Sequence, residues 1–256
     1  MLLDMHVHTT AYSDCAQMSP YEMAERAREV GLDGVVITEH NAIWSDEEIA
    51  ELRRLFPGLA FFRGVEVSAK KHHVLVYGLT DFTGFEAGMP VQEVVALAHE
   101  RGAVAVWAHP LQYSLAPHPE GLQAGFDACE TRSINIDRLE RDRYRKLARR
   151  LGIPEMANSD AHHTLTLGAY ATRFWHPVKD EKEIAEAIRQ GAFTPEERFR
   201  WSKPASAMRE KLWHRRIRGM LAKGIKDPVE IKRRAGASLQ RIRRIMEREV
   251  GRQYTT

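Results

Sequence analysis

The chain has 256 residues, with 38 Lys and Arg against 35 Asp and Glu and a formal net charge of +3. A hydrophobic share of 43% and a charged share of 29% are ordinary for a soluble globular protein. No run of about eighteen apolar residues occurs and the start lacks a signal-peptide pattern, so we expect no membrane span and a cytoplasmic location. The two cysteines, Cys15 and Cys129, lie far apart, which excludes a disulfide-rich scaffold.

The charges are unevenly distributed along the chain. Residues 200–256 hold 17 Lys and Arg but 5 Asp and Glu, whereas residues 1–199 hold 21 and 30. This shift predicts a boundary near residue 200, with one domain at 1–200 and a basic helical tail at 204–256. Such a segment commonly binds an anionic partner, most often DNA or RNA. A charged helical face that is simply solvated is the alternative interpretation.

Short apolar runs, typical of buried strands, recur along residues 1–200. The first surrounds His6 and His8, which are two residues apart and therefore project from the same side of a strand. The predicted strands span residues 2–8, 34–40, 59–68, 73–79, 103–109, 126–131, 154–160 and 171–175.

Helical patterns lie between these strands. The first begins with Ser19 as N-cap and Pro20 at the first helical position, and the second is capped by Ser45. The patterns span residues 19–31, 45–55, 89–102, 136–152 and 179–191. Strands that alternate with helices and are nearly continuously apolar predict an α/β fold with a parallel sheet or barrel.

Strand after strand carries a residue able to bind a metal at or near one end. In a parallel barrel the carboxyl ends of the strands converge on one face, where active sites are built. Imidazoles and carboxylates together suit Zn, Mn or Fe ions, so this face is a predicted metal centre. The residues concerned are His6 and His8, His40, Glu66, His73, His109, and Asp160 with His162.

The ligand types favour a phosphorylated substrate. The three carboxylates Asp14, Glu66 and Asp160 do not neutralise two or three divalent cations, so a positive excess remains for a phosphate ester. A hydroxide between two metals is a nucleophile at neutral pH, and the metals also stabilise charge on the phosphoryl oxygens.

The motifs DMHVHT, YSD, ITEH, GVEVS, HVLVYGL, WAHP and NSDAH occur in this order between Asp4 and His162. In this the chain resembles the PHP (polymerase and histidinol phosphatase) family of metal-dependent phosphoesterases, over residues 1 to about 200. The resemblance implies a distorted (β/α)7 TIM-like barrel with a trinuclear metal centre at its carboxyl-end face, followed here by a small all-α segment. The metals are two or three divalent ions, with Mn, Zn and Fe as candidates.

The resemblance also implies which residue holds which metal. Glu66 bridges the first two metals, and a metal-bound hydroxide is held by Glu66, Asp160 and His109. The first metal takes His6, His8, Glu66 and Asp160; the second takes Glu66, His73 and His109; the third takes Asp14, His40 and His162.

Several assignments have competitors. His72 is an alternative to His73, and His163 to His162, although the VLVYGL run after His73 and the SDAH spacing favour the residues chosen. Asp14 stands where some relatives have His. The amidohydrolase superfamily also begins with HxH on a barrel strand. It usually has a mid-chain Lys as the bridging group and a single Asp on the last strand, so Glu66 here favours PHP.

The basic tail resembles a helix-turn-helix. A helical pattern at 204–223 precedes a helix capped by Asp227, a turn at Gly236 and a further helix capped by Ser238. Lys232, however, occupies a position where such motifs usually have a small residue. In the helix-turn-helix interpretation the residues on or near the face offered to a duplex are Gln240, Arg241, Arg243 and Arg244. A helical lid or a dimerisation hairpin is the equal alternative.

These observations predict a metal-dependent phosphoesterase whose substrate is a nucleotide or a nucleic-acid end. A small phosphomonoester such as histidinol phosphate is the alternative substrate. A DNA-binding regulator, in which the barrel serves as a sensor or scaffold, is the alternative of a different class.

Overall fold

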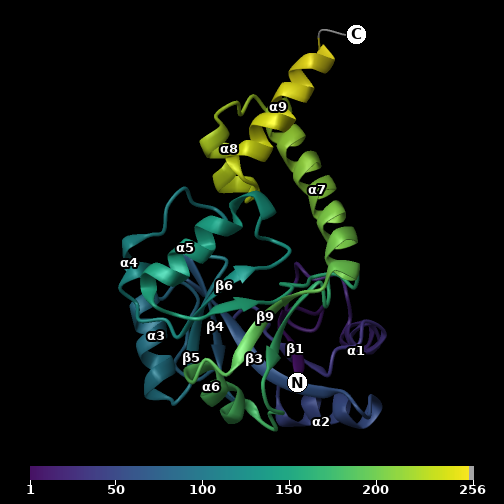
Figure 1. The fold of residues 1–256 in the computed structure, drawn as a ribbon, viewed down its shortest axis with the longest axis vertical. Helices are drawn as coiled ribbons and strands as arrows, with labels where there is room; N and C mark the ends of the chain where they lie inside the picture. Colours follow the sequence, from purple (N-terminus) through teal and green to yellow (C-terminus); the bar gives the residue numbers. More distant parts are fainter. Residues whose placement is uncertain (254–256) are drawn as a thin grey trace.

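The computed structural model describes residues 1–253, and nine strands in this range form one sheet (Figure 1). The order of strands across the sheet is β7-β6-β5-β4-β3-β2-β1-β8-β9. The strands are β1 (Leu2–Val7), β2 (Gly34–Ile37), β3 (Ala60–Ala69), β4 (His72–Tyr77), β5 (Val104–Ala108), β6 (Ala128–Arg132), β7 (Glu155–Ala157), β8 (Tyr170–Phe174) and β9 (Phe193–Glu197).

The sheet curls into a nearly closed barrel. The segment after β7 runs beside β1, where the His8 amide donates to the Ala161 carbonyl at 2.9 Å and the Ala161 amide donates to the His6 carbonyl at 3.1 Å. These two bonds join the last part of the barrel to its first strand. The predicted α/β barrel with a helical C-terminal segment is therefore confirmed.

The barrel is distorted because β4 runs against both of its neighbours. It pairs antiparallel with β3 and with β5, whereas β1–β2, β2–β3, β5–β6 and β6–β7 are parallel. The start of β4 therefore lies at the same end of the barrel as the ends of its neighbours. This explains why His73 comes at the beginning of its strand and not at the end.

The edge strand β9 was not predicted. Its sequence FTPEE contains Pro195, which lacks an amide hydrogen, and carries little apolar character. Thr172 of β8 pairs with Pro195, and β9 has no partner on its other side in the strand order. An edge position of this kind tolerates proline, so the pattern that identifies a buried strand is missing here.

The helices begin where their caps predict. Ser19 and Ser45 each form a capping box, with Glu22 and Glu48 respectively. The helices of residues 1–198 are α1 (Pro20–Glu29), α2 (Asp46–Leu55), α3 (Val91–Glu100), α4 (Pro119–Leu122), α5 (Arg141–Leu151), preceded by a 3₁₀ turn at Arg138–Glu140, and α6 (Glu181–Arg189).

The tail forms three helices, α7 (Phe199–Ala222), α8 (Pro228–Ala235) and α9 (Leu239–Gln253). The first begins at Phe199, before the predicted start at 204, and contains Pro204. In Figure 1, α7 rises along one side of the barrel, and α8 and α9 lie beyond α5. Trp213, Ile217, Ile231, Ile242 and Ile245 meet in one small core. None of the helices in residues 1–253 has the length and apolar character of a transmembrane span.

Candidate metal centre

Glu66 of β3 lies at the centre of the predicted ligands and is 1% exposed. Its Oε2 atom is 3.3 Å from His6 Nε2, 3.2 Å from His8 Nε2 and 3.0 Å from His40 Nδ1. Its Oε1 atom faces the other way. Glu66 therefore stands between two sets of imidazoles, as expected of a carboxylate that bridges two metals.

The second set of imidazoles comes from β4 and β5. His73 Nδ1 lies 2.8 Å, and His109 Nε2 3.2 Å, from Glu66 Oε1. Asp160, which follows β7, lies 3.4 Å from His6 Nε2 through Oδ1 and 3.7 Å from His109 Nε2 through Oδ2. The two carboxylates are thus shared across the whole cluster.

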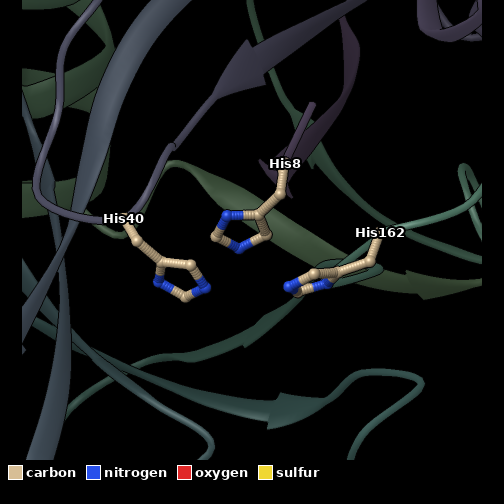
Figure 2. Close-up of side chains that lie close together, drawn as sticks. All are labelled: His8, His40 and His162. Carbon is tan, nitrogen blue, oxygen red and sulfur yellow. The ribbon is translucent and has the colours of Figure 1, made fainter. Parts of the chain in front are cut away.

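Figure 2 shows a further group, formed by His8, His40 and His162. The ring centroid of His8 lies 4.3 Å from that of His40 and 4.2 Å from that of His162. A nitrogen from each ring lies within 4.8 Å of the others. This group contains two of the three residues predicted for the third metal, His40 and His162, with His8 in the place of Asp14.

Asp14 is not brought into this cluster. It is exposed, and it appears in none of the metal-capable groups formed by the described residues. The neighbouring Ser13 is buried instead, and its Oγ donates to Glu39 Oε2 at 2.5 Å. Cys15 lies beside the third group instead. Burial raises the pKa of Cys15, but its hydrogen bonds with His162 and His40 outweigh burial and lower that pKa to about 6.

A divalent metal fits the donor set, as its unsatisfied atoms indicate. His6 Nε2, His8 Nε2, His40 Nδ1 and Glu66 Oε2 are buried, and none has a hydrogen-bond partner within the described residues. Buried polar atoms are almost always hydrogen-bonded, so four that converge without a partner are suited to binding a cation. Nitrogen and oxygen donors of this kind suit Zn, Mn or Fe.

Opposite charges within the cluster outweigh the effect of burial on the pKa values of its groups. Burial lowers the pKa of His6, but Asp160 and Glu66 outweigh it and raise that pKa well above its ordinary value. Burial raises the pKa of Glu66, but His6 and His73 hold it well below its ordinary value. Metal and proton therefore compete for the same nitrogens.

Local backbone irregularities aim the ligands. The β1–β2 register shifts between Asp4 and Val7. Met5 packs in the barrel interior but Val7 packs under α1 and α2, so the shift turns His6 and His8 toward the interior. His109 and Asp160 have φ values of 26° and 54°. Such positive values are rare for residues other than glycine and are retained mainly at functional sites.

A second layer of carboxylates, which the sequence analysis missed, supports the ligands. Glu130, in the middle of β6, is fully buried, and its Oε1 lies 3.1 Å from His6 Nδ1. Its Oε2 accepts the His109 amide at 3.2 Å. A carboxylate behind a ligating imidazole fixes the tautomer and orientation of the ring. The available signal was an acidic residue at the end of the predicted strand 126–131.

Replacing Glu130 by Gln is expected to weaken metal binding by about 10–100-fold, because the positioning carboxylate behind His6 loses its charge. The measurement is metal affinity by competition with a chelator. Asp127→Asn is a matched control, because Asp127 binds the exposed His99 at 2.9 Å, away from the centre. Equal affinity in the parent and Glu130→Gln would contradict the positioning role.

The competitors of two ligands lie elsewhere. His72 points away from the Glu66 cluster, and its ring packs 5.5 Å from the rings of Trp107 and His118. His163 borders the cavity above the centre, but its Nδ1 accepts the Leu165 amide at 3.1 Å. Neither belongs to a metal-capable group among the described residues.

A cavity of about 650 Å³ opens onto the cluster. Its floor includes Glu66 and Asp160, and Asn135 donates to Asp160 Oδ2 from the wall. Tyr113 lies on another wall, and residues of α7 such as Arg209 close the far side. Pockets of about 300–1,000 Å³ bind small ligands, so the cluster faces a space of substrate size.

The four predicted duplex contacts differ in their surroundings. Gln240, Arg243 and Arg244 are exposed. Arg241 is less exposed than these three. Its side chain is 13% exposed and binds Asp137 Oδ2 at 2.7 Å and Oδ1 at 2.9 Å. Arg241 therefore contacts the segment before α5, whereas the other three predicted duplex contacts face solvent.

Two family models match the chain. One, described as PHP domain, matches residues 4–120, and the other, described as PHP-associated, matches residues 138–193. The chain belongs to the PHP family. As a PHP protein it is a metal-dependent phosphoesterase, a hydrolase acting on phosphoric ester bonds, as the sequence predicted. No curated protein sequence matches the chain.

Solved structures share this PHP fold. PsfC from Pseudomonas syringae PB-5123 is 21% identical, with a TM-score of 0.59 over 82% of this chain and 98% of its own. A two-domain protein from Bacteroides vulgatus, containing a predicted PHP-like metal-dependent phosphoesterase, is 17% identical, with a TM-score of 0.58 over 80% and 68%. The lesion-specific endonuclease PfuEndoQ from Pyrococcus furiosus is 21% identical, with a TM-score of 0.57 over 76% and 57%.

Proposed function

We propose that this PHP protein hydrolyses phosphate esters in a nucleotide or at the end of a nucleic-acid strand. The observation that carries the proposal is the placement of the Glu66 cluster at the floor of a cavity whose far side is lined by arginines of α7. A site with cations below and arginines above favours a substrate with several negative charges.

The residues of the cluster have separate roles in this proposal. His6, His8, Glu66 and Asp160 would hold one metal, and Glu66 would be shared with a second metal held by His73 and His109. His40 and His162 would hold the third, because His8 Nε2 has a single lone pair and faces Glu66. Metals bound here lower the pKa of a coordinated water and stabilise charge on the phosphoryl oxygens. Asn135 fixes the orientation of Asp160 by donating to its Oδ2 atom.

The cavity restricts the form of the substrate. Because α7 covers the cluster, a strand end or a free nucleotide enters more readily than an intact duplex. One structural neighbour, PfuEndoQ, is a lesion-specific endonuclease, which supports nucleic acid as a substrate class. A small phosphomonoester also fits a cavity of about 650 Å³ and is the second candidate.

The test compares substrates with one protein preparation loaded in turn with Mn, Zn and Fe. We expect nucleotides or phosphorylated single strands to have kcat/KM values at least about tenfold above those of histidinol phosphate and p-nitrophenyl phosphate. The Asp160→Asn variant is the control that detects phosphate release by a contaminating phosphatase. The reverse order of substrates would favour a small phosphomonoester. Specific duplex binding with no turnover under any metal would favour a regulator.

A further inference from the structure

Three arginines of α7 border the cavity above the metal centre: Arg209, Arg215 and Arg216. They lie outside the matched PHP segments, which end at residue 193. The cavity wall that they form is therefore supplied by the tail and not by the segments that the family models match.

These arginines lack the ionic partners that other tail arginines have. Arg218 binds Glu249 at 3.0 Å, and Arg234 binds Glu230 at 2.6 Å. Within the part of the chain whose side chains are described, no carboxylate lies at ion-pair distance from the three cavity arginines. Charge left unpaired at a cavity wall favours an anionic ligand in that cavity.

The side chain of Arg209 packs against Trp213 of the same helix. Its guanidinium lies 5.3 Å from the centroid of the Trp213 ring, which is 3% exposed. Its Nε atom is buried without a hydrogen-bond partner in the described residues. Burial lowers the pKa of Arg209, whereas the nearby Tyr113 and Asp160 act in the opposite direction. Because Arg209 lines the same cavity as Glu66 and Asp160, one ligand in that cavity can contact all three.

The cavity is larger than one phosphate group needs. At about 650 Å³ it has roughly twenty times the 30 Å³ that one water occupies in the liquid. A single phosphate has the bulk of only a few waters, so one held by metals on the floor leaves most of the space free. The planar guanidinium group of arginine matches phosphate oxygens in pairs, which suits it to a second phosphate.

We propose that Arg209, Arg215 and Arg216 form a subsite for a phosphate of the substrate other than the one that is hydrolysed. The inference rests on the proposed function and assigns the substrate class: a single-stranded nucleic-acid end with at least two phosphates. The exposed arginines of α9 are not needed for this binding.

The test uses the full chain with Arg209, Arg215 and Arg216 all replaced by Gln. The substrates are a short 5′-phosphorylated single-stranded oligonucleotide and p-nitrophenyl phosphate. Relative to the parent, kcat/KM for the oligonucleotide is expected to fall at least about tenfold more than for p-nitrophenyl phosphate, through KM. The salt dependence of oligonucleotide binding, measured in EDTA, is expected to decrease by about 0.7 in log–log slope for each phosphate that an arginine no longer neutralises.

Arg233→Gln removes one charge from the exposed face of α8 and is the matched control for the single variant Arg216→Gln. Arg216→Gln, at an exposed position, is the second variant in case the triple variant does not fold. Equal losses for both substrates, or equal losses in Arg233→Gln, would overturn the subsite. If the parent releases phosphate from no substrate, the proposed function fails. The EDTA binding measurement then decides this inference alone, and unchanged binding overturns it.

Discussion

Replacing Glu66 by Gln is expected to reduce phosphate release by at least about 10³-fold, equal to roughly 4 kcal/mol of transition-state stabilisation. Glu66 is 1% exposed and receives two imidazoles on Oε1 and three on Oε2. Gln has nearly the same shape but no charge, and its nitrogen does not coordinate a cation. The two halves of the centre would then lose the ligand that joins them.

The measurement pairs phosphate release with metal content per chain, because both are expected to fall together. Glu100→Gln, at the exposed end of α3, is the control for the loss of one carboxylate charge. A Glu66→Gln protein that retained activity within tenfold of the parent would exclude Glu66 as a shared ligand. Loss of activity with full metal content would limit its role to orientation of the reacting groups.

The barrel and most of the clustered side chains were predictable from strand patterns. Parallel strands place their carboxyl ends at one face, which brings the segments of Glu66, His109 and Asp160 together, whereas His6 faces the interior because of the register shift in β1. His73 fitted for a different reason, the antiparallel course of β4. The order of the motifs predicted His73, whereas strand periodicity alone did not explain why a ligand would lie at the start of a strand.

The surroundings of Asp14 and Glu130 depend on contacts that strand periodicity does not describe. Asp14 lies in the turn-rich segment between β1 and α1, where side-chain direction depends on local contacts such as that of Ser13 with Glu39. Glu130 lies on a regular strand, but its role depends on contact with His6, 124 residues earlier in the chain. Neither the outward turn of Asp14 nor this long-range pair has a sequence pattern of its own.

The helix-turn-helix pattern of the tail predicts its local structure but not how the tail packs against the barrel. The predicted caps and turn are present, with Asp227 capping α8 and Gly236 in the left-handed conformation at φ 72°. A Cβ at Gly236 would lie 3.0 Å from Gln112 Cγ and from Tyr113 Cε1, so the turn packs closely against the loop beside the cavity. The helix-turn-helix pattern therefore describes the tail locally, while long-range contacts place it over the barrel.

Two buried ion pairs hold the tail in that position. Lys232, which departs from the usual small residue, is fully buried and donates to Glu140 Oε2 at 2.8 Å. Arg241 binds both oxygens of Asp137, which also accepts the Ser238 amide at 3.3 Å. Burial raises the pKa of Asp137, but its contact with Arg241 outweighs burial and lowers that pKa. These pairs join α8 and α9 to the segment before α5, and Arg241 also binds Glu210 of α7 at 2.9 Å.

Replacing Asp137 by Ala is therefore expected to weaken docking of the tail by about 3 kcal/mol, because Arg241 loses a partner that binds it through both oxygens and keeps only the half-exposed Glu210. The fraction of molecules with the tail released would rise about 10²-fold, and tryptic cleavage within residues 224–249 would rise with it. Asp142→Ala is the control, since the Asp142 side chain is 85% exposed on α5. Equal cleavage in the parent and Asp137→Ala would contradict docking by this pair.

The same pair predicts a dependence on pH with a definite sign. A carboxyl whose pKa is lower in the docked state stabilises docking above its ordinary pKa of about 4 and loses that effect as pH falls through the lowered value. The difference in cleavage between the parent and an Asp137→Asn variant should therefore be full at pH 6 and shrink below about pH 4. Because α7 carries the cavity arginines, release of the tail should also reduce oligonucleotide binding in EDTA. If the tail is released but oligonucleotide binding is unchanged, binding of the oligonucleotide does not require the docked position of the tail.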